Sequence, residues 1–190
     1  MSPSLRPERR RRGSAALEFT LAAPIVAMLG LAMLDVVDFL RVSLRLERTA
    51  GEIANVIAQY EVLAEAEFAT IFDLARRIAD PYRVTQEDGA VIVSGIAHTG
   101  PGPSVLWQRR AGSSGYASAF GAEGGPATIP ASSGDLVIAP GQGAVVTEVF
   151  LAREPWLLSG RFLPGAPFSR LRTFAVQRPR MVSILRVSGT

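Results

Sequence analysis

Apolar residues are concentrated in one long segment near the N-terminus. After Gly13 the chain stays apolar as far as Leu40, and residues 19–34 carry no charge at all. As a helix, residues 14–40 would extend over about 40 Å, whereas the hydrocarbon core of a bilayer is about 30 Å thick. We therefore predict a transmembrane helix over residues 14–40, with its acidic residues near the two membrane interfaces. These acidic residues are Glu18, Asp35 and Asp38.

A basic leader precedes the apolar segment. Residues 1–13 hold five arginines and one glutamate, a net charge of +4, and the cluster Arg9–Arg12 directly adjoins the apolar residues. By the positive-inside rule, the leader stays in the cytoplasm and the chain after Leu40 crosses the membrane. Two alternatives are a buried core helix in a soluble protein and a basic arm that binds nucleic acid. The rest of the chain holds fifteen arginines and sixteen acidic residues, a net charge of −1, which disfavours nucleic-acid binding.

The apolar segment differs from a removable export signal. It is longer than the signal-peptide core of about 7–15 residues, and no pair of small residues marks a cleavage site after Leu34. A carboxylate inside the segment also fits neither a secretory nor a twin-arginine signal. We expect the helix to be retained in the membrane.

Glu18 is the residue of this segment that most needs an explanation. A charged group at the centre of a membrane helix costs about 2.5–3.5 kcal/mol, so an intramembrane carboxylate is a functional candidate. One interpretation places Glu18 near the cytoplasmic interface, where it reaches the headgroups. The other requires a cationic partner, and a cut after Gly13 would create one in the new α-amino group of Ser14.

The residues around Glu18 form a recognisable motif. Gly13, four residues ending at Leu17, and then Glu18 and Phe19 resemble a prepilin processing site. With the arginine-rich leader and the apolar helix, the segment resembles the TadE-like minor pseudopilins of tight-adherence (Flp) pilus systems. That family often has tyrosine at the position of Phe19, and phenylalanine keeps the ring without the hydroxyl.

The resemblance implies how the protein matures and what it contacts. A prepilin peptidase would cut between Gly13 and Ser14 at the cytoplasmic face, and Glu18 and Phe19 would pack against other pilin helices. The implied partners are membrane lipid, other pilins and pseudopilins, the prepilin peptidase and the pilus platform proteins. The implied location is the bacterial inner membrane, crossed once, with a cytoplasmic N-terminus and a periplasmic C-terminal domain.

Residues 41–80 have the pattern of amphipathic helices. Charged residues at the i,i+3 spacing of Asp38 and Arg41 and the i,i+4 spacing of Arg48 and Glu52 support a helix that leaves the bilayer, with a bend predicted at Gly51. A second helix is predicted over 65–79, stopped by a proline at position 81. Its core stripe is expected to be Phe68, Ile71, Phe72, Ala75 and Ile78.

Residues 81–190 have the pattern of strands and turns. Short β-prone runs occur at position 84 and at 91–93 and 105–107, and the clearest strand, 144–151, alternates two faces. A final strand pair is predicted from 172–177 and 181–187, and long loops at 111–134 and 154–170. The order of elements predicts an α+β fold: an N-terminal transmembrane and amphipathic helix followed by a pilin-like domain with a mostly antiparallel sheet. Residues 147–150 and 178–180 also resemble segments near the C-terminus of TadE-like proteins.

Composition offers little catalytic chemistry. All twenty basic residues are arginine, and the absence of cysteine excludes thiol catalysis and cysteine-based metal sites. The single histidine, His98, lies beside a Gly/Pro turn, and the glycine pairs lack the lysine of a phosphate loop. Trp107 and Trp156 are expected to be core or edge aromatics. We predict no enzyme activity, no cofactor and no metal.

These observations predict a structural protein, a minor pseudopilin that primes, caps or regulates assembly of a tight-adherence pilus. One alternative is an unprocessed, membrane-anchored TadG-like component. Another is a membrane-tethered extracytoplasmic module that binds a ligand through its Gly-rich loops. The first differs from the other two in its mature N-terminus. Residues 1–12, rich in proline, serine and arginine, are expected to be disordered.

Overall fold

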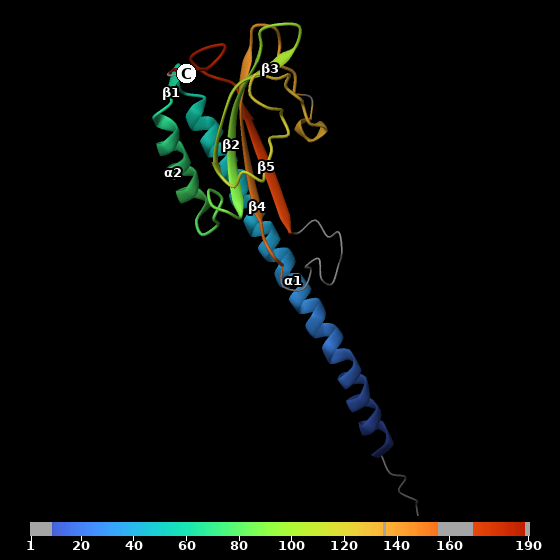
Figure 1. The fold of residues 1–190 in the computed structure, drawn as a ribbon. Coiled ribbons are helices and arrows are strands. Elements are labelled where there is room, and N and C mark those ends of the chain that lie inside the picture. Colours follow the sequence, from blue (N-terminus) through green and yellow to red (C-terminus); the bar gives the residue numbers. More distant parts are fainter. Residues whose placement is uncertain (1–8, 135, 156–168, 189–190) are drawn as a thin grey trace, which may run out of the picture.

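The computed structural model describes residues 9–134, 136–155 and 169–188, and its longest element is the helix α1, Arg9–Ile57 (Figure 1). The helix is continuous through Pro24 and Gly51, so neither residue interrupts it. Buried residues on both sides of Gly51, including Ala50 and Ile53, hold the helix against the domain, which outweighs the cost of about 1 kcal/mol for a helical glycine. The expectation of disorder is wrong for positions 9–12, which are helical, and positions 1–8 lie outside the described residues.

The second helix, α2, covers Glu67–Ala79 and follows the short strand β1, Val62–Ala64. The Glu67 carboxylate accepts a hydrogen bond of 2.8 Å from the backbone N–H of Ala64, which ties the helix start to the strand end. All five stripe residues predicted for this helix belong to the main hydrophobic core or pack against it. The predicted helix and its core face are confirmed.

Four antiparallel strands form the sheet, in the spatial order β3-β2-β4-β5. They are β2, Gly89–His98; β3, Pro103–Gly112; β4, Gly143–Ala152; and β5, Arg170–Gln177. The predicted runs at 91–93, 105–107 and 144–151 lie inside these longer strands. Val84 instead lies in the turn region before β2, although its side chain is fully buried. The mostly antiparallel α+β architecture is as predicted.

The predicted final strand pair is wrong. β5 pairs with β4, and the last strand, β6, Arg186–Ser188, pairs in parallel with β1. The chain between them is held by other partners: the N–H of Arg180 donates to Ala58 O at 2.8 Å, and Ser183 O accepts from Gly143 N at 2.8 Å. These contacts fix the segment at the end of α1 and the start of β4, so it does not turn back along β5.

The sheet is covered on both faces (Figure 1). The part of α1 after Leu34, called its outer half below, packs with α2 on one face of the sheet, against Val145, Val149 and neighbouring residues. The loop after β3 packs on the other face. The two faces of the strand predicted at 144–151 are thereby confirmed. That loop contains the short 3₁₀ helix η1, Ala131–Ser133. It follows β3, whose last residue is Gly112, so most of the loop predicted at 111–134 is confirmed.

Trp107 is a core residue, as one of its predicted alternatives had it. Its ring lies against Gly95, where an added Cβ would come within 2.2 Å of the indole, and its Nε1–H donates to Leu185 O at 3.0 Å. The β2–β3 register shifts between Gly95 and Ile96, which places Leu106 as an extra residue in β3 and turns Trp107 toward the helices. Trp156 lies outside the described residues.

Candidate functional site

The first half of α1 is exposed on all sides. From Ala15 to Leu34 almost every side chain is exposed, and Figure 1 shows this part of the helix extending alone away from the domain. Large apolar side chains at least 44% exposed occur at positions on every side of the helix. They are Leu17, Phe19, Leu21, Ile25, Val26, Met28, Leu29, Leu31, Met33 and Leu34.

Length and composition make this helix a candidate membrane span. At about 1.5 Å per residue, Ala15–Leu34 covers about 30 Å, which is the thickness of a hydrocarbon core. Only 6% of the most apolar window of the helix is buried, so this part of the helix does not belong to the core of the described domain. A helix that is apolar all round is suited to a membrane or to burial among other helices rather than to water.

The predicted processing residues lie at the start of this exposed half. Gly13 and Ser14 belong to the first turns of α1, and Glu18 and Phe19 follow on exposed positions. Glu18 is three residues after Ala15, about 5 Å along the helix axis, which is near one end of the apolar stretch rather than its centre. The Thr20 hydroxyl donates to Ala16 O at 2.7 Å, so this polar group is satisfied within the helix.

The exposed half ends where α1 meets the domain. Asp35 is buried, and one turn later Asp38 Oδ2 lies 2.6 Å from Arg153 Nη2. The Arg153 side chain follows the end of β4 and is only 10% exposed, whereas that of Asp38 is about half exposed. The acidic residues predicted at the outer membrane interface therefore lie at the contact between helix and domain, and Asp38 has its ion-pair partner within the chain.

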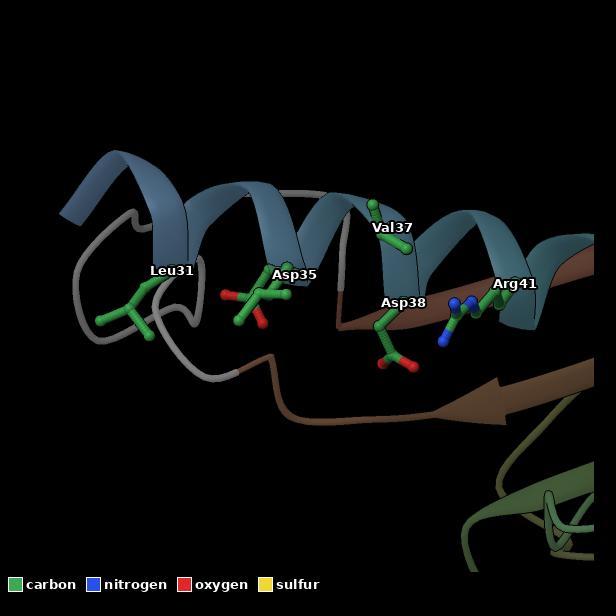
Figure 2. A pocket seen from close by; sticks show the side chains of 6 residues that line it. Leu31, Asp35, Val37, Asp38 and Arg41 are labelled. Atoms are coloured by element: carbon green, nitrogen blue, oxygen red, sulfur yellow. The ribbon is translucent and has the colours of Figure 1, made fainter. Parts of the chain in front are cut away.

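A hollow of about 340 Å³ lies beside this junction. Figure 2 shows Leu31, Asp35, Asp38 and Arg41 projecting from the same side of α1, with Val37 on the opposite side. Its lining changes from apolar at Leu31 to charged at Arg41 within three turns of helix. The hollow therefore lies at the boundary between the apolar stretch and the domain.

His98, the single histidine, has a structural contact. Among the residues that the structure describes, no group of three or more His, Asp or Glu side chains could hold a metal ion. His98 forms a 2.8 Å hydrogen bond between its Nδ1 and Ile138 O, which attaches the loop after η1 to β2.

Glu148 is the buried charge that sequence reasoning did not single out. Its carboxylate is fully buried, accepts hydrogen bonds from the Ala119 N–H at 3.1 Å and from the Ser118 hydroxyl, and lies 2.9 Å from Arg172 Nη2. These bonds hold the Gly/Ser-rich loop on the sheet. The signal was present in the sequence, because a glutamate alternating with Val146 and Phe150 on one strand face must be buried with them.

Comparisons with known proteins gave no relative. Neither the protein-family models, nor the curated proteins, nor the solved structures contain a match to this chain. Functional inference therefore depends on the exposed half of α1 and on the motif at its start.

Proposed function

We propose that this protein is a minor pseudopilin that takes part in assembly of a tight-adherence pilus. The observation that supports it most is the exposed apolar stretch Ala15–Leu34, because a domain with its own core has no use for such a helix in water. The prepilin-like motif from Gly13 to Phe19 lies directly at its start.

In this proposal the exposed half of α1 crosses the bacterial inner membrane once. Arg9–Arg12 stay in the cytoplasm by the positive-inside rule, and the sheet domain lies in the periplasm. During assembly, lipid around the helix is replaced by the helices of other pilins and pseudopilins. Large apolar side chains exposed all round the helix can serve in either environment.

Processing would change the electrostatics at the start of the helix. A cut between Gly13 and Ser14 removes a leader of five arginines and one glutamate, a net charge of +4, and leaves an α-amino group four residues before Glu18. In a medium of low dielectric, a carboxylate and an ammonium group attract more strongly than at a protein surface. Glu18 can therefore pair with this amine on the same chain or on a neighbouring pilin helix.

The processing claim is tested by the mass of the membrane-extracted protein from cells with an active prepilin peptidase. We expect a mature chain that begins at Ser14. Gly13→Ala should block or slow the cut, because a side chain keeps the peptidase away from the scissile bond. Gly30→Ala is the matched control: this glycine also lies in the exposed half, nothing lies within 4 Å of an added Cβ, and its replacement should leave maturation unchanged.

The assembly claim is tested separately from the cut. Glu18→Gln should leave the mature N-terminus in place and reduce co-purification with other pilins by roughly tenfold, since removing one charge from a low-dielectric contact costs more than 1 kcal/mol. Glu52→Gln, an exposed glutamate on the outer half of α1, is the control. In the processing experiment, a full-length chain that retains Arg9–Arg12 would contradict the proposal and would identify an unprocessed, anchored component instead.

A further inference from the structure

On one side of α1, exposed apolar residues continue past Leu34. Met33, Val37, Leu40 and Leu44 follow one another at intervals of three or four residues, so they share one side of the helix, called the outward stripe below. Leu40 is 52% exposed and Leu44 is 65% exposed, which is as much as Leu34 at 64%. The outward stripe therefore extends the exposed apolar surface into the outer half of α1.

The outward stripe faces away from the domain. Leu44 and the buried core residue Leu46 are two positions apart, which is about 200° around a helix of 3.6 residues per turn. Figure 2 likewise shows Val37 projecting to the side of α1 opposite Asp35. The domain thus covers one side of the outer half and leaves the outward stripe uncovered.

The apolar surface ends at different positions on the two sides of the helix. On the domain side it ends at Asp35, which is buried at the junction. On the outward side it continues to Leu44, and the next residue of the same row is the exposed Glu47. Leu34 and Leu44 are ten residues apart, about 15 Å along the helix axis. A boundary between apolar and polar surroundings that follows both ends is oblique to the helix.

The kind of side chain favours lipid as the contact of the outward stripe. Contacts between helices in membranes are enriched in small residues that let the backbones approach, whereas this stripe consists of methionine, valine and leucine. It is also continuous with Ala15–Leu34, which is long enough to cross a hydrocarbon core.

A basic residue lies on the flank of the stripe. Arg41 is exposed and lies between the two leucines in sequence. Asp38, the acidic residue one turn earlier, is paired with Arg153 at 2.6 Å. An arginine this close to the apolar surface can keep its carbon chain among the acyl chains while its guanidinium extends to the lipid phosphates.

We propose that the outward stripe, from Met33 to Leu44, lies against the phospholipid bilayer, so that α1 leans toward that side. Its leucines occupy the boundary between acyl chains and headgroups, as the apolar face of an interfacial helix does. The sheet domain then lies on the upper side of the leaning helix, away from the lipid. A lean is ordinary for a membrane helix, since the average tilt is about 20°. This inference rests on the proposed membrane span, and its test separates the two.

The test uses the full chain in phosphatidylcholine vesicles, with a nitrobenzoxadiazole label on a single introduced cysteine. Leu44→Cys carries the label on the stripe. Arg45→Cys is the matched control at the same depth along the axis, because the Arg45 side chain extends the other way, to Ile78 O of α2. Lipids brominated near the headgroup end of the acyl chain quench the label. We expect at least about threefold stronger quenching at position 44 than at position 45.

A second pair of variants tests the lean without a label on the stripe leucines. The label is placed by Val37→Cys, and the two leucines are replaced either by serine, Leu40→Ser with Leu44→Ser, or by methionine, Leu40→Met with Leu44→Met. Serine removes the apolar contact, so quenching at position 37 should fall by about twofold or more, whereas methionine should leave it unchanged. Both leucines are exposed, so neither pair should disturb the core of the domain.

The outcomes distinguish this inference from the membrane span itself. Equal quenching at positions 44 and 45, or equal effects of the serine and methionine pairs, would overturn the lean. If a label at Leu29→Cys is still quenched by lipids brominated deep in the acyl chain, the span remains. Absence of quenching at position 29 would overturn both. Efficient disulfide formation between two unlabelled Leu44→Cys chains in dilute vesicles would overturn lipid as the contact in favour of a second copy.

Discussion

The two halves of α1 belong to one uninterrupted helix and have opposite surroundings. Between Ala15 and Leu34 the apolar side chains face outward on all sides, whereas the outer half buries one stripe against the sheet domain. Residues of that stripe recur at intervals of three or four along the helix. They are Val42, Leu46, Ala50, Ile53 and Ile57.

This difference shows that helix length alone says little about the environment of a helix. The outer half has the one-sided pattern of a helix that packs on a core, with charged residues such as Arg48 and Glu52 on its other side. The exposed half, Ala15–Leu34, is the inner half of the helix, and it has no charged residue from Phe19 to Leu34. The change between the two patterns occurs at Asp35, where the domain begins to cover the helix.

The largest expected effect comes from removing the inner half. A shortened chain that begins at Asp35 keeps the buried stripe and the Asp38–Arg153 ion pair, so it should fold and remain in the supernatant without detergent. The full chain should sediment with membranes, because Ala15–Leu34 exposes a large apolar area. Ultracentrifugation, with circular dichroism of the soluble fraction, measures both. Aggregation of the shortened chain, or a spectrum without sheet, would contradict the division of α1 into two halves.

A matched pair of substitutions compares the halves residue by residue. Ile53→Ala should reduce the free energy of unfolding of the domain by about 2–5 kcal/mol, because Ile53 is fully buried and its replacement leaves a cavity. Ile25→Ala removes the same atoms from a side chain that is 62% exposed, so the domain should change by less than about 0.5 kcal/mol. Urea unfolding in detergent measures both. Equal losses would mean that the two halves share one environment.

The junction between the halves should be sensitive to its ion pair. Asp38→Asn leaves the mostly buried Arg153 without its counter-charge and should cost about 1–3 kcal/mol of unfolding free energy. Replacing both residues, Asp38→Asn with Arg153→Met, should recover part of that loss, since no unpaired charge is then buried. Glu52→Gln, in the exposed 3.9 Å pair with Arg48, is the control and should cost less than about 0.5 kcal/mol.

The smallest expected effect concerns acid pH. The hydrogen bonds that Arg109 donates to the Glu65 carboxylate lower the pKa of Glu65 below its ordinary value and raise the pKa of Arg109. The stability from a carboxylate with a lowered pKa is present above its unfolded-state pKa and is lost as pH falls through its folded-state pKa. The urea concentration at the unfolding midpoint should therefore decrease slightly as the pH is lowered below about 4.5. Glu65→Gln should make this decrease with pH smaller. An unchanged slope would show that the pair contributes nothing to stability.

Local patterns predicted much of the fold. The stripe of α2 and the alternation of β4 are periodic signals, and each placed its residues on the correct faces. Pairings between distant segments were not predictable, because the partner of β6 is β1, more than a hundred residues earlier in the chain. Gly51 does not interrupt α1 for a related reason: glycine propensity is local, whereas packing of the neighbouring residues against the domain stabilises the helix.

The candidate site divides in the same way. Its apolar stretch and its motif from Gly13 to Phe19 are contiguous in sequence, so reading the chain in order was enough to find them. The ion-pair partner of Asp38 is Arg153, which follows the end of β4. The partner of Glu148 is Arg172, on the neighbouring strand β5. Both require contacts across the chain that no local pattern encodes.

The accessibility of single cysteines tests the central claim most directly, because the chain has no cysteine of its own. Three full-length variants, each combined with Gly13→Ala so that the leader is retained, are compared in intact cells with a membrane-impermeant maleimide: Arg6→Cys in the leader, Leu29→Cys in the inner half and Arg48→Cys in the outer half. We predict labelling at position 48 from outside the inner membrane, labelling at position 6 only after lysis, and at position 29 only after detergent. Labelling of position 29 in intact cells at the rate of position 48 would contradict a helix whose inner half lies in the membrane.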